Sequence, residues 1–254
     1  MVYLHILRKI IYKPGDFNMH STDAFLGGRI KLKQKINGLR ATSDSVLVAA
    51  AVQAKPNETI LDVGAGNGVI GLCISARVPI KLTALEIQED LVSLIQENAL
   101  LNDKKITVIR NDIFQSEDPL KGQLFNHVVT NPPFYDTTGD SRKDAEQALA
   151  YTANFDLKIW LDYCLKHLRA KGSFTMIHRP ECLPVILPVL AKKLGNIQII
   201  PIQAKTNTGA KRVIIRGILG SARPLSLCPP IVMHTQAEKP SHRANSILRS
   251  GHSI

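Results

Sequence analysis

Short apolar runs alternate with longer amphipathic segments from residue 59 to residue 219. The short runs are rich in β-branched residues and are followed by glycine, acidic or asparagine residues, a pattern typical of buried strands that end in turns. The expected strands span residues 59–65, 80–87, 105–113, 124–134, 173–179, 196–204 and 210–219. The expected helices span residues 69–78, 88–102, 144–172 and 182–195. The alternation predicts an α/β fold with a doubly wound parallel sheet, and the absence of a helix between the last two strands predicts an antiparallel hairpin.

The residues before this region have a different pattern. Residues 29–36, RIKLKQKI, alternate between apolar and basic positions, which predicts a strand with one basic face. The inward face comprises Ile30, Leu32, Gln34 and Ile36, and the basic face comprises Lys31, Lys33 and Lys35. Asn37-Gly38 predicts a tight turn and with it a hairpin. Ser43 or Asp44 is expected to cap the helix that follows.

Three regions follow from these patterns. Residues 1–50 form an N-terminal extension of hairpin and helix, and residues 51–220 form the α/β domain. The tail over residues 221–254 is rich in Pro, Ser, His and Arg, so we expect it to be loosely packed or disordered. A short helix is expected within its RANSILRS segment.

Three further expectations concern the helices. Lys171-Gly172 predicts the C-terminal end of the long helix over residues 144–172. Pro188 is expected to kink the last helix of the domain. Trp160 has Phe155 and Leu157 nearby at helical spacing and is therefore assigned to the core.

The amino-acid composition indicates what kind of partner the protein binds and in which cellular compartment it acts. The chain has 254 residues and a formal net charge of +11, which favours a polyanion such as nucleic acid. Its four cysteines form no Cys-x-x-Cys pair, which predicts reduced thiols, no disulfide framework and no metal site. No window is apolar enough to span a membrane, and the N-terminal segment lacks the features of a signal peptide. We therefore expect a cytoplasmic protein without a membrane partner, with a monomer favoured.

A cluster of glycines follows the strand at residues 59–65. The sequence LDVGAGNGVIG satisfies the G-x-G-x-x-G pattern, in which glycine permits positive φ and close approach of a ligand to the backbone. Both a pyrophosphate ligand and S-adenosylmethionine remain open from this pattern alone. Glu86, at the end of the next strand, can accept hydrogen bonds from ribose hydroxyls, and Asp112 can accept from an adenine amino group while Ile113 covers the ring. The carboxyl ends of parallel strands converge, so these groups are expected to share one crevice.

The Asn131-Pro132-Pro133-Phe134 sequence lies at the end of the fourth expected strand, in the same crevice. An adenine amino group is a weak nucleophile because its lone pair is delocalised into the ring. The Asn131 side-chain oxygen and the Pro132 carbonyl are expected to accept from its two N–H bonds, and Phe134 or Tyr135 to stack on the base. Proline limits φ and removes competing N–H groups. Positioning then supplies most of the rate, and no strong general base is required.

The glycine motif, Glu86, NDIF and NPPF occur in the order found in class I S-adenosylmethionine-dependent methyltransferases, and the chain resembles their "small" family. Within that family it is most similar to the tRNA1(Val) adenine-37 N6-methyltransferases, through GLRATSDSVLVAAA and GAKRVIIRGIL. The resemblance implies a Rossmann-like sheet of seven strands with the last strand antiparallel, S-adenosyl-L-methionine as donor and a structured RNA, most simply tRNA, as acceptor.

The resemblance also implies roles for individual residues. The catalytic set is Asn131, Pro132, Pro133 and Phe134, and the substrate-binding set is Tyr135 and Arg40. The cofactor-binding set is Asp62, Gly64, Ala65, Gly66, Gly68, Glu86, Ile87, Asp112, Ile113, Asn131 and Asp44. A basic rim for RNA phosphates is expected from Lys31, Lys33, Lys35, Arg40, Arg142, Lys143, Lys205, Lys211 and Arg212, with His178 and Arg179 lining the crevice.

Other functions share parts of this pattern. Protein-glutamine N5-methylation on release factors poses the same chemical problem, because an amide NH2 is also a weak nucleophile. Guanine-N2 methylation of ribosomal RNA uses a similar motif. A cofactor-sensing or RNA-binding protein with an inactive site, and an NAD oxidoreductase, remain further alternatives. The positive charge favours RNA over the protein substrate, and the Asn-Pro-Pro sequence has no role in an oxidoreductase.

Overall fold

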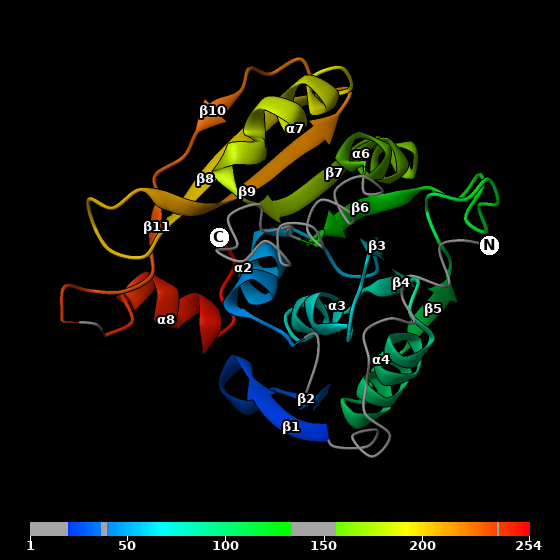
Figure 1. Ribbon diagram of the computed structural model, residues 1–254, viewed down its shortest axis with the longest axis horizontal. Helices are drawn as coiled ribbons and strands as arrows, with labels where there is room; N and C mark the ends of the chain where they lie inside the picture. The colour runs from blue at the N-terminus through cyan, green and yellow to red at the C-terminus, as the bar shows by residue number, and fades with distance from the viewer. Residues whose placement is uncertain (1–19, 37–39, 134–155, 238) are drawn as a thin grey trace, which may run out of the picture.

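The computed structural model describes residues 20–36, 40–133, 156–237 and 239–254 (Figure 1). One large mixed sheet runs through the molecule, and a two-stranded sheet lies apart from it. Helices cover both faces of the large sheet, as a doubly wound arrangement requires (Figure 1). None of the helices in the described ranges combines the length and the apolar character needed to cross a bilayer.

The large sheet contains the seven strands that were expected and two more. Its order is β10-β8-β9-β7-β6-β3-β4-β5, and β11 also pairs with β8. The seven expected strands are β3 (Thr59–Val63), β4 (Lys81–Glu86), β5 (Ile106–Arg110), β6 (Phe125–Thr130), β7 (Leu168–His178), β8 (Leu194–Gln203) and β9 (Ala210–Leu219). Strands β3 to β7 are parallel, and β9 lies antiparallel between β7 and β8. The predicted parallel sheet and the antiparallel last strand are both confirmed.

The helices divide between two hydrophobic clusters. One cluster joins the sheet to α2 (Ser43–Ala51), α3 (Val69–Ser75) and α8 (His242–Leu248). The other joins the opposite face to α6 (Leu157–Lys166) and α7 (Leu183–Leu190), which follows a short 3-10 turn, η2 (Pro180–Cys182). Helix α4 (Glu89–Leu101) packs beside β5 and β2. Strand β3 illustrates the alternation, because Ile60 belongs to the first cluster while Leu61 and Val63 belong to the second.

The predicted strand over residues 29–36 forms a hairpin with the strand before it, and not through the predicted turn after it. Strand β2 (Ile30–Lys35) pairs with the preceding strand β1 (His20–Phe25) through the turn η1 (Leu26–Gly28), whereas the predicted turn at 37–38 lies outside the described residues. The alternation itself is confirmed, since Ile30, Leu32 and Gln34 are buried. Ile36, however, is 42% exposed, because it lies past the last residue that β1 pairs with.

The expected caps of α2, Ser43 or Asp44, are wrong, since they lie one and two positions past the N-cap residue. Thr42 occupies the N-cap position and its side chain makes no capping hydrogen bond. Asp44 lies in the first turn of the helix, where its carboxylate accepts instead from the Arg212 Nε–H at 2.8 Å. An acid in the first turn still favours the helix through its dipole.

Helix α6 is shorter than the sequence pattern predicted. It ends at Lys166, and β7 already begins at Leu168, so Lys171-Gly172 lies inside a strand rather than at a helix terminus. Lys171 has φ +62°, and a Cβ at Gly172 would come within 2.9 Å of the Asn126 carbonyl oxygen. The glycine therefore allows an irregular part of β7 to pass close to β6. The segment of the predicted helix over residues 144–155 lies outside the described residues.

The C-terminal tail is folded, which corrects the expectation of disorder. Strands β10 (Ser226–Leu227) and β11 (Ile231–Val232) extend the sheet in parallel with β8. The predicted short helix is present as α8, which contacts α2, and the Ile254 N–H donates to the Ala50 carbonyl oxygen at 3.0 Å. The expectation was wrong because it rested on the average composition of the tail. A few apolar residues in it become buried, namely Ile231, Ala244 and Ile247.

Candidate functional site

The glycine loop between β3 and α3 has the backbone geometry that its sequence predicted. Gly64, Gly66 and Gly68 all have positive φ, between +60° and +84°. The N–H groups of Gly64 and Ala65 both donate to the Leu85 carbonyl oxygen, at 2.9 and 3.0 Å, which fixes the loop against the end of β4. A Cβ at Gly64 would lie 2.8 Å from the Trp160 ring, so glycine is required there for space as well as for conformation.

Glu86 is buried beneath this loop and is held by backbone donors. One carboxylate oxygen accepts from the Gly66 N–H at 2.8 Å, and the other accepts from the Ile87 and Gln88 N–H groups at 2.9 and 3.0 Å. Burial raises the pKa of Glu86, and these three hydrogen bonds oppose the shift because they stabilise the ionised form. The carboxylate is thus rigidly placed beside half-buried Ile87, with lone pairs left over for a ligand hydroxyl.

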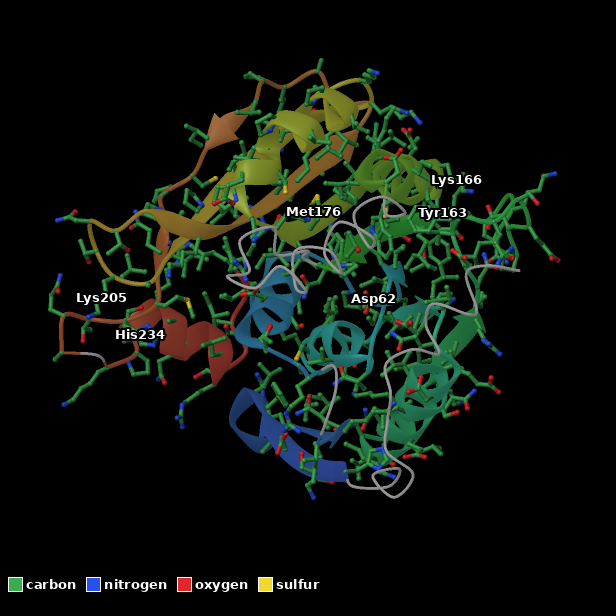
Figure 2. The ribbon with its side chains drawn as sticks, in the orientation of Figure 1. Asp62, Tyr163, Lys166, Met176, Lys205 and His234 are labelled. Carbon is green, nitrogen blue, oxygen red and sulfur yellow. The ribbon has the colours of Figure 1, made fainter. Side chains whose placement is uncertain are left out.

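Asp62 is as deeply buried as Glu86 but lacks the hydrogen bonds that hold Glu86. It lies near the middle of the molecule beside α3, it is 1% exposed, and neither carboxylate oxygen has a hydrogen-bond partner among the described residues (Figure 2). Burial raises the pKa of Asp62 to about 7. The Gly71 N–H lies close enough to oppose this rise without meeting hydrogen-bond geometry, and the nearby charge of Glu86 adds to the rise. The predicted part of Asp62 in cofactor binding stays a prediction.

The end of β5 supplies the third acid. One oxygen of Asp112 accepts from the Phe114 N–H at 3.0 Å in a tight turn. The Asn111 N–H donates to the Glu86 carbonyl oxygen at 3.1 Å, so the ends of β4 and β5 are tied together. Ile113 is buried next to Asp112. The second Asp112 oxygen makes no hydrogen bond within the described residues, which leaves an acceptor at the same edge as the glycine loop.

Asn131 follows β6 at this edge, and its side-chain amide is only partly satisfied. The Asn131 Oδ1 atom is buried and has no hydrogen-bond partner among the described residues, while Nδ2 lies 3.5 Å from Ser45 Oγ. Pro132 is buried and Pro133 is exposed. Phe134 and Tyr135 lie outside the described residues, so their expected stacking stays a prediction.

The strand that carries Asn131 is anchored by two residues to which sequence reasoning gave no role in the site. Thr130 donates from Oγ1 to the Val63 carbonyl oxygen at 2.8 Å and accepts from the Trp160 indole N–H at 3.0 Å. Trp160 is buried, as predicted, and it also limits the space beside Gly64. A lone tryptophan in the sequence gave no signal for this second role.

A buried polar network joins the hairpin to the glycine loop, and sequence reasoning missed it. The Gln34 side chain donates to Asp23 and accepts from the Ala41 N–H and from the Asn67 side chain, the latter at 3.1 Å. Asn98 of α4 donates to the Asn67 carbonyl oxygen at 3.0 Å. Gln34, Asn67 and Asn98 are each at most 3% exposed. The only sequence signal was a polar residue at an inward position of an alternating strand.

The two less certain residues of the predicted site contact other parts of the protein. Arg40 forms an ion pair with Asp23 and donates to the Lys35 carbonyl oxygen at 2.8 Å, so it closes the open end of the hairpin. Asp44 pairs with Arg212 at the end of β9. Neither side chain is brought into contact with the glycine loop by these bonds.

The expected basic rim is divided between paired and exposed residues. Lys33 pairs with Glu97 at 2.7 Å and Lys35 pairs with Asp90, so these hairpin lysines bind α4. Lys211 is exposed at the start of β9, and Lys205 is half-buried just past the end of β8. Arg142 and Lys143 lie outside the described residues. The basic face of β2 therefore serves first to hold the hairpin on the domain.

His178 ends β7 and Arg179 follows it, on the same edge as Asn131. Burial lowers the pKa of His178 to about 4, and its side chain is 5% exposed. A buried imidazole with a low pKa is neutral at physiological pH. Lining of the crevice by these two residues stays a prediction.

Relatives of known name and solved structures resemble this chain over most of its length. A tRNA1(Val) (adenine(37)-N6)-methyltransferase from Shewanella amazonensis is 26% identical over 142 residues, which cover 55% of this chain and 60% of that protein. A putative protein N5-glutamine methyltransferase from Methanocaldococcus jannaschii is 28% identical over 151 residues, covering 58% of this chain and 75% of that protein.

Two solved structures share the fold at low identity. The crystal structure of a predicted O-methyltransferase from Agrobacterium tumefaciens matches with a TM-score of 0.65 and 21% identity, covering 83% of this chain and 98% of that one. A T. thermophilus 16S rRNA N2 methyltransferase, solved with AdoMet and guanosine, matches with a TM-score of 0.56 and 19% identity over 79% of this chain and 50% of that one.

The matched segments are partial, since the first two curated relatives are covered over 60% and 63% of their own lengths. The profile of a protein family, by contrast, spans the described site as a whole. It matches residues 41–205, from just before α2 to just after β8, and so includes the glycine loop, Glu86, Asp112 and Asn131. The chain belongs to the methyltransferase small domain family.

Proposed function

We propose that this protein transfers a methyl group from S-adenosylmethionine to an exocyclic amino group of a base in RNA, with adenine N6 in tRNA as the substrate best supported. Several relatives with this name match the chain, including those from Shewanella amazonensis and Photorhabdus laumondii. The net charge of +11 also favours a nucleic acid over a neutral protein substrate.

The described residues fit the cofactor on chemical grounds. The positive-φ glycines at 64, 66 and 68 give the loop a backbone conformation that L side chains rarely adopt and that lets a ligand approach the backbone closely. Glu86 and the second oxygen of Asp112 are acceptors, suited to ribose hydroxyls and to an adenine amino group, and Ile113 offers an apolar surface to the ring. When bound, S-adenosylmethionine supplies a methyl group that is already activated toward nucleophiles.

The unpartnered Asn131 oxygen is the observation that carries the proposal. A buried amide oxygen without a hydrogen bond is unfavourable by about 1–3 kcal/mol, so it calls for a donor from a bound molecule. An exocyclic NH2 is such a donor, and accepting from one of its N–H bonds withdraws the nitrogen lone pair from the ring and makes it more nucleophilic. The rigid Pro132 supplies a second backbone carbonyl directly after Asn131.

No strong base is needed for this reaction. The amino nitrogen becomes acidic once it carries the new methyl group, so its proton can leave to water. Burial keeps His178 neutral, so its imidazole adds no positive charge of its own against the charge that develops on the amino nitrogen. The residues act chiefly by orientation and by exclusion of water.

The direct test is methylation of RNA by the purified chain. Total tRNA and ribosomal RNA from a strain that lacks the protein are incubated with labelled S-adenosylmethionine, digested and analysed by mass spectrometry of nucleosides. A parallel reaction contains an unmethylated release factor, whose peptides are analysed in the same way. Appearance of N6-methyladenosine in one tRNA supports the proposal. Appearance of N2-methylguanosine instead would move the reaction to the guanine alternative, and label found only in a glutamine of a release factor would refute an RNA substrate.

Partners and compartment follow from the same proposal. Contacts to RNA phosphates would come from basic residues such as the exposed Lys211 and the half-buried Lys205, and they would give an affinity that falls with salt. We further propose that the protein acts in the cytoplasm as a monomer, where tRNA modification by related enzymes would place it.

A further inference from the structure

A second pocket lies at the amino edge of the sheet, opposite the edge that carries the glycine loop. Its volume is about 460 Å³, and it is lined by residues that begin β6 and β7 and end β9. Asn126 and His127 belong to its wall, whereas Asn131 lies past the other end of the same strand. Five residues of extended chain separate Asn126 from Asn131, about 16 Å, so the pocket is distinct from the methyl-transfer crevice.

The wall of this pocket is strongly cationic. It includes Lys55, Arg169, Lys171 and Arg216. The first three are exposed and form no ion pair within the described parts of the chain. Glu58 is the only carboxylate among the lining residues, and it is engaged by the His127 Nε2 atom at 2.7 Å and by the Lys55 N–H at 2.7 Å. The positive charges of the wall therefore exceed the single negative charge among its lining residues.

Arg216 is the most specific feature of the pocket. It is half-buried on β9, where its Nε–H donates to the Gln198 side-chain oxygen at 2.5 Å and its Nη1 to the Ala51 carbonyl oxygen at 3.3 Å. Both acceptors are neutral, and no carboxylate pairs with it in the described structure. Burial lowers the pKa of Arg216, because a charged guanidinium without a carboxylate partner is unfavourable in a half-buried position. The guanidinium is held in one orientation and retains donors for a further acceptor.

Further polar groups surround the cations. His127 bridges two lining residues, because its Nδ1 atom lies 2.6 Å from Ser173 Oγ while its Nε2 atom contacts Glu58. The side-chain oxygen of Asn126 accepts from Thr59, which leaves the NH2 group of Asn126 as a donor. The pocket thus combines fixed cations with hydrogen-bond donors, which is the arrangement that recognises phosphate.

We propose that this pocket binds a phosphate group, with Arg216 as the central contact and Arg169 and Lys171 at the rim. The phosphate could belong to a free phosphorylated molecule or to an RNA backbone that passes around this edge of the sheet. Both sources present the same chemistry to Arg216, and binding would supply the counterion that the guanidinium lacks. The proposal does not depend on methyl transfer.

Calorimetric titration with pyrophosphate is the first arm of the test. The wild-type chain should show saturable binding, Arg216→Gln should weaken it at least tenfold, and the pair Arg169→Gln/Lys171→Gln should do so by a similar factor. Arg243→Gln on α8 and Lys105→Gln before β5 remove equal charges from exposed positions outside the pocket, and binding should stay within twofold. Because the rim variants change only exposed side chains, they keep the test valid if Arg216→Gln disturbs folding.

RNA binding at fixed salt is the second arm and distinguishes the sources. If pyrophosphate competes with tRNA, and if pocket variants weaken tRNA binding more than the two control variants, the phosphate belongs to the RNA backbone. If pyrophosphate binds without competing, the pocket serves a free phosphorylated ligand. Absence of saturable pyrophosphate binding together with equal RNA affinity of pocket and control variants would overturn the proposal, whether or not the chain methylates RNA.

Discussion

The two edges of the central sheet present opposite kinds of polar group. The carboxyl edge gathers acceptors, namely Glu86, Asp112 and the unpartnered oxygen of Asn131. The amino edge gathers donors and cations around Arg216. Ribose hydroxyls and amino groups are donors and phosphates are acceptors, so each edge suits one part of a nucleotide-containing ligand. The comparison teaches that the chemistry of a bound group can be inferred from the polar groups that the protein leaves unsatisfied.

The largest expected effect concerns the acceptor at the carboxyl edge. Asn131→Ala should lower the rate of methyl transfer by about a hundred- to a thousandfold, the range typical of removing one group that stabilises a transition state. The affinity for S-adenosylmethionine should stay within threefold, because the glycine loop and Asp112 are unchanged. Single-turnover assays and calorimetry measure the two quantities. Asn245→Ala on the exposed face of α8 is the control. If the two variants have equal activity, Asn131 has no catalytic role and the proposed contrast between the two edges fails.

The buried carboxyl of Asp62 predicts a dependence of stability on pH. The pKa of Asp62 rises from 3.8 to about 7 on folding, so its contribution to stability is fully present below pH 3.8 and is lost as the pH rises through 7. Asp62→Asn removes this dependence. The wild type loses stability between pH 4 and pH 8 and the variant does not. The free energy of unfolding of the variant, relative to that of the wild type, should therefore increase over this range by on the order of a few kcal/mol.

Chemical denaturation at several pH values measures that gain. Glu117→Gln, at an exposed position, is the matched control and should follow the wild type throughout. A difference between Asp62→Asn and the wild type that stays constant over this range would show that Asp62 is ionised in the folded protein.

The network behind the glycine loop predicts a smaller effect that links the hairpin to the carboxyl edge. Gln34→Ala leaves the Ala41 N–H and the Asn67 amide without a buried partner, so it should destabilise the fold by about 1–3 kcal/mol. It should also weaken cofactor binding a few-fold, because Asn67 belongs to the glycine loop. Thermal unfolding and calorimetry measure both effects, with exposed Gln115→Ala as the control. Unchanged cofactor affinity in a destabilised Gln34→Ala protein would reduce the network to a structural role.

The smallest effect separates the two oxygens of Asp112. Asp112→Ala should weaken cofactor binding about tenfold, the value of one hydrogen bond to a charged group. Asp112→Asn keeps an oxygen for the turn bond to the Phe114 N–H and should lose less. If both variants bind S-adenosylmethionine as the wild type does, the acceptor at the end of β5 has no part in the site.

Sequence patterns predicted the parts of the fold whose periodicity is local. The alternation of apolar runs and helices located the strands from β3 to β9, and the positive φ values of Gly64, Gly66 and Gly68 agree with the glycine motif. Where the pattern was weak, the prediction was wrong. Lys171-Gly172 has the composition of a helix end but lies in β7, because the glycine is needed for a close approach to β6. The tail was expected to be disordered because its few buried side chains are diluted by polar residues.

The sequence by itself determined the order of the elements, the glycine loop and the presence of acids and an asparagine at successive strand ends, because these depend on spacing along the chain. Tertiary structure decided which polar groups are satisfied. Only the folded chain brings Gln34 to Asn67 and pairs the hairpin lysines with α4. Within the described residues it also leaves Asn131 Oδ1 without a donor and gives Arg216 neutral partners but no carboxylate. Hydrogen bonding and burial depend on neighbours that lie far apart in the sequence, and no local pattern encodes them.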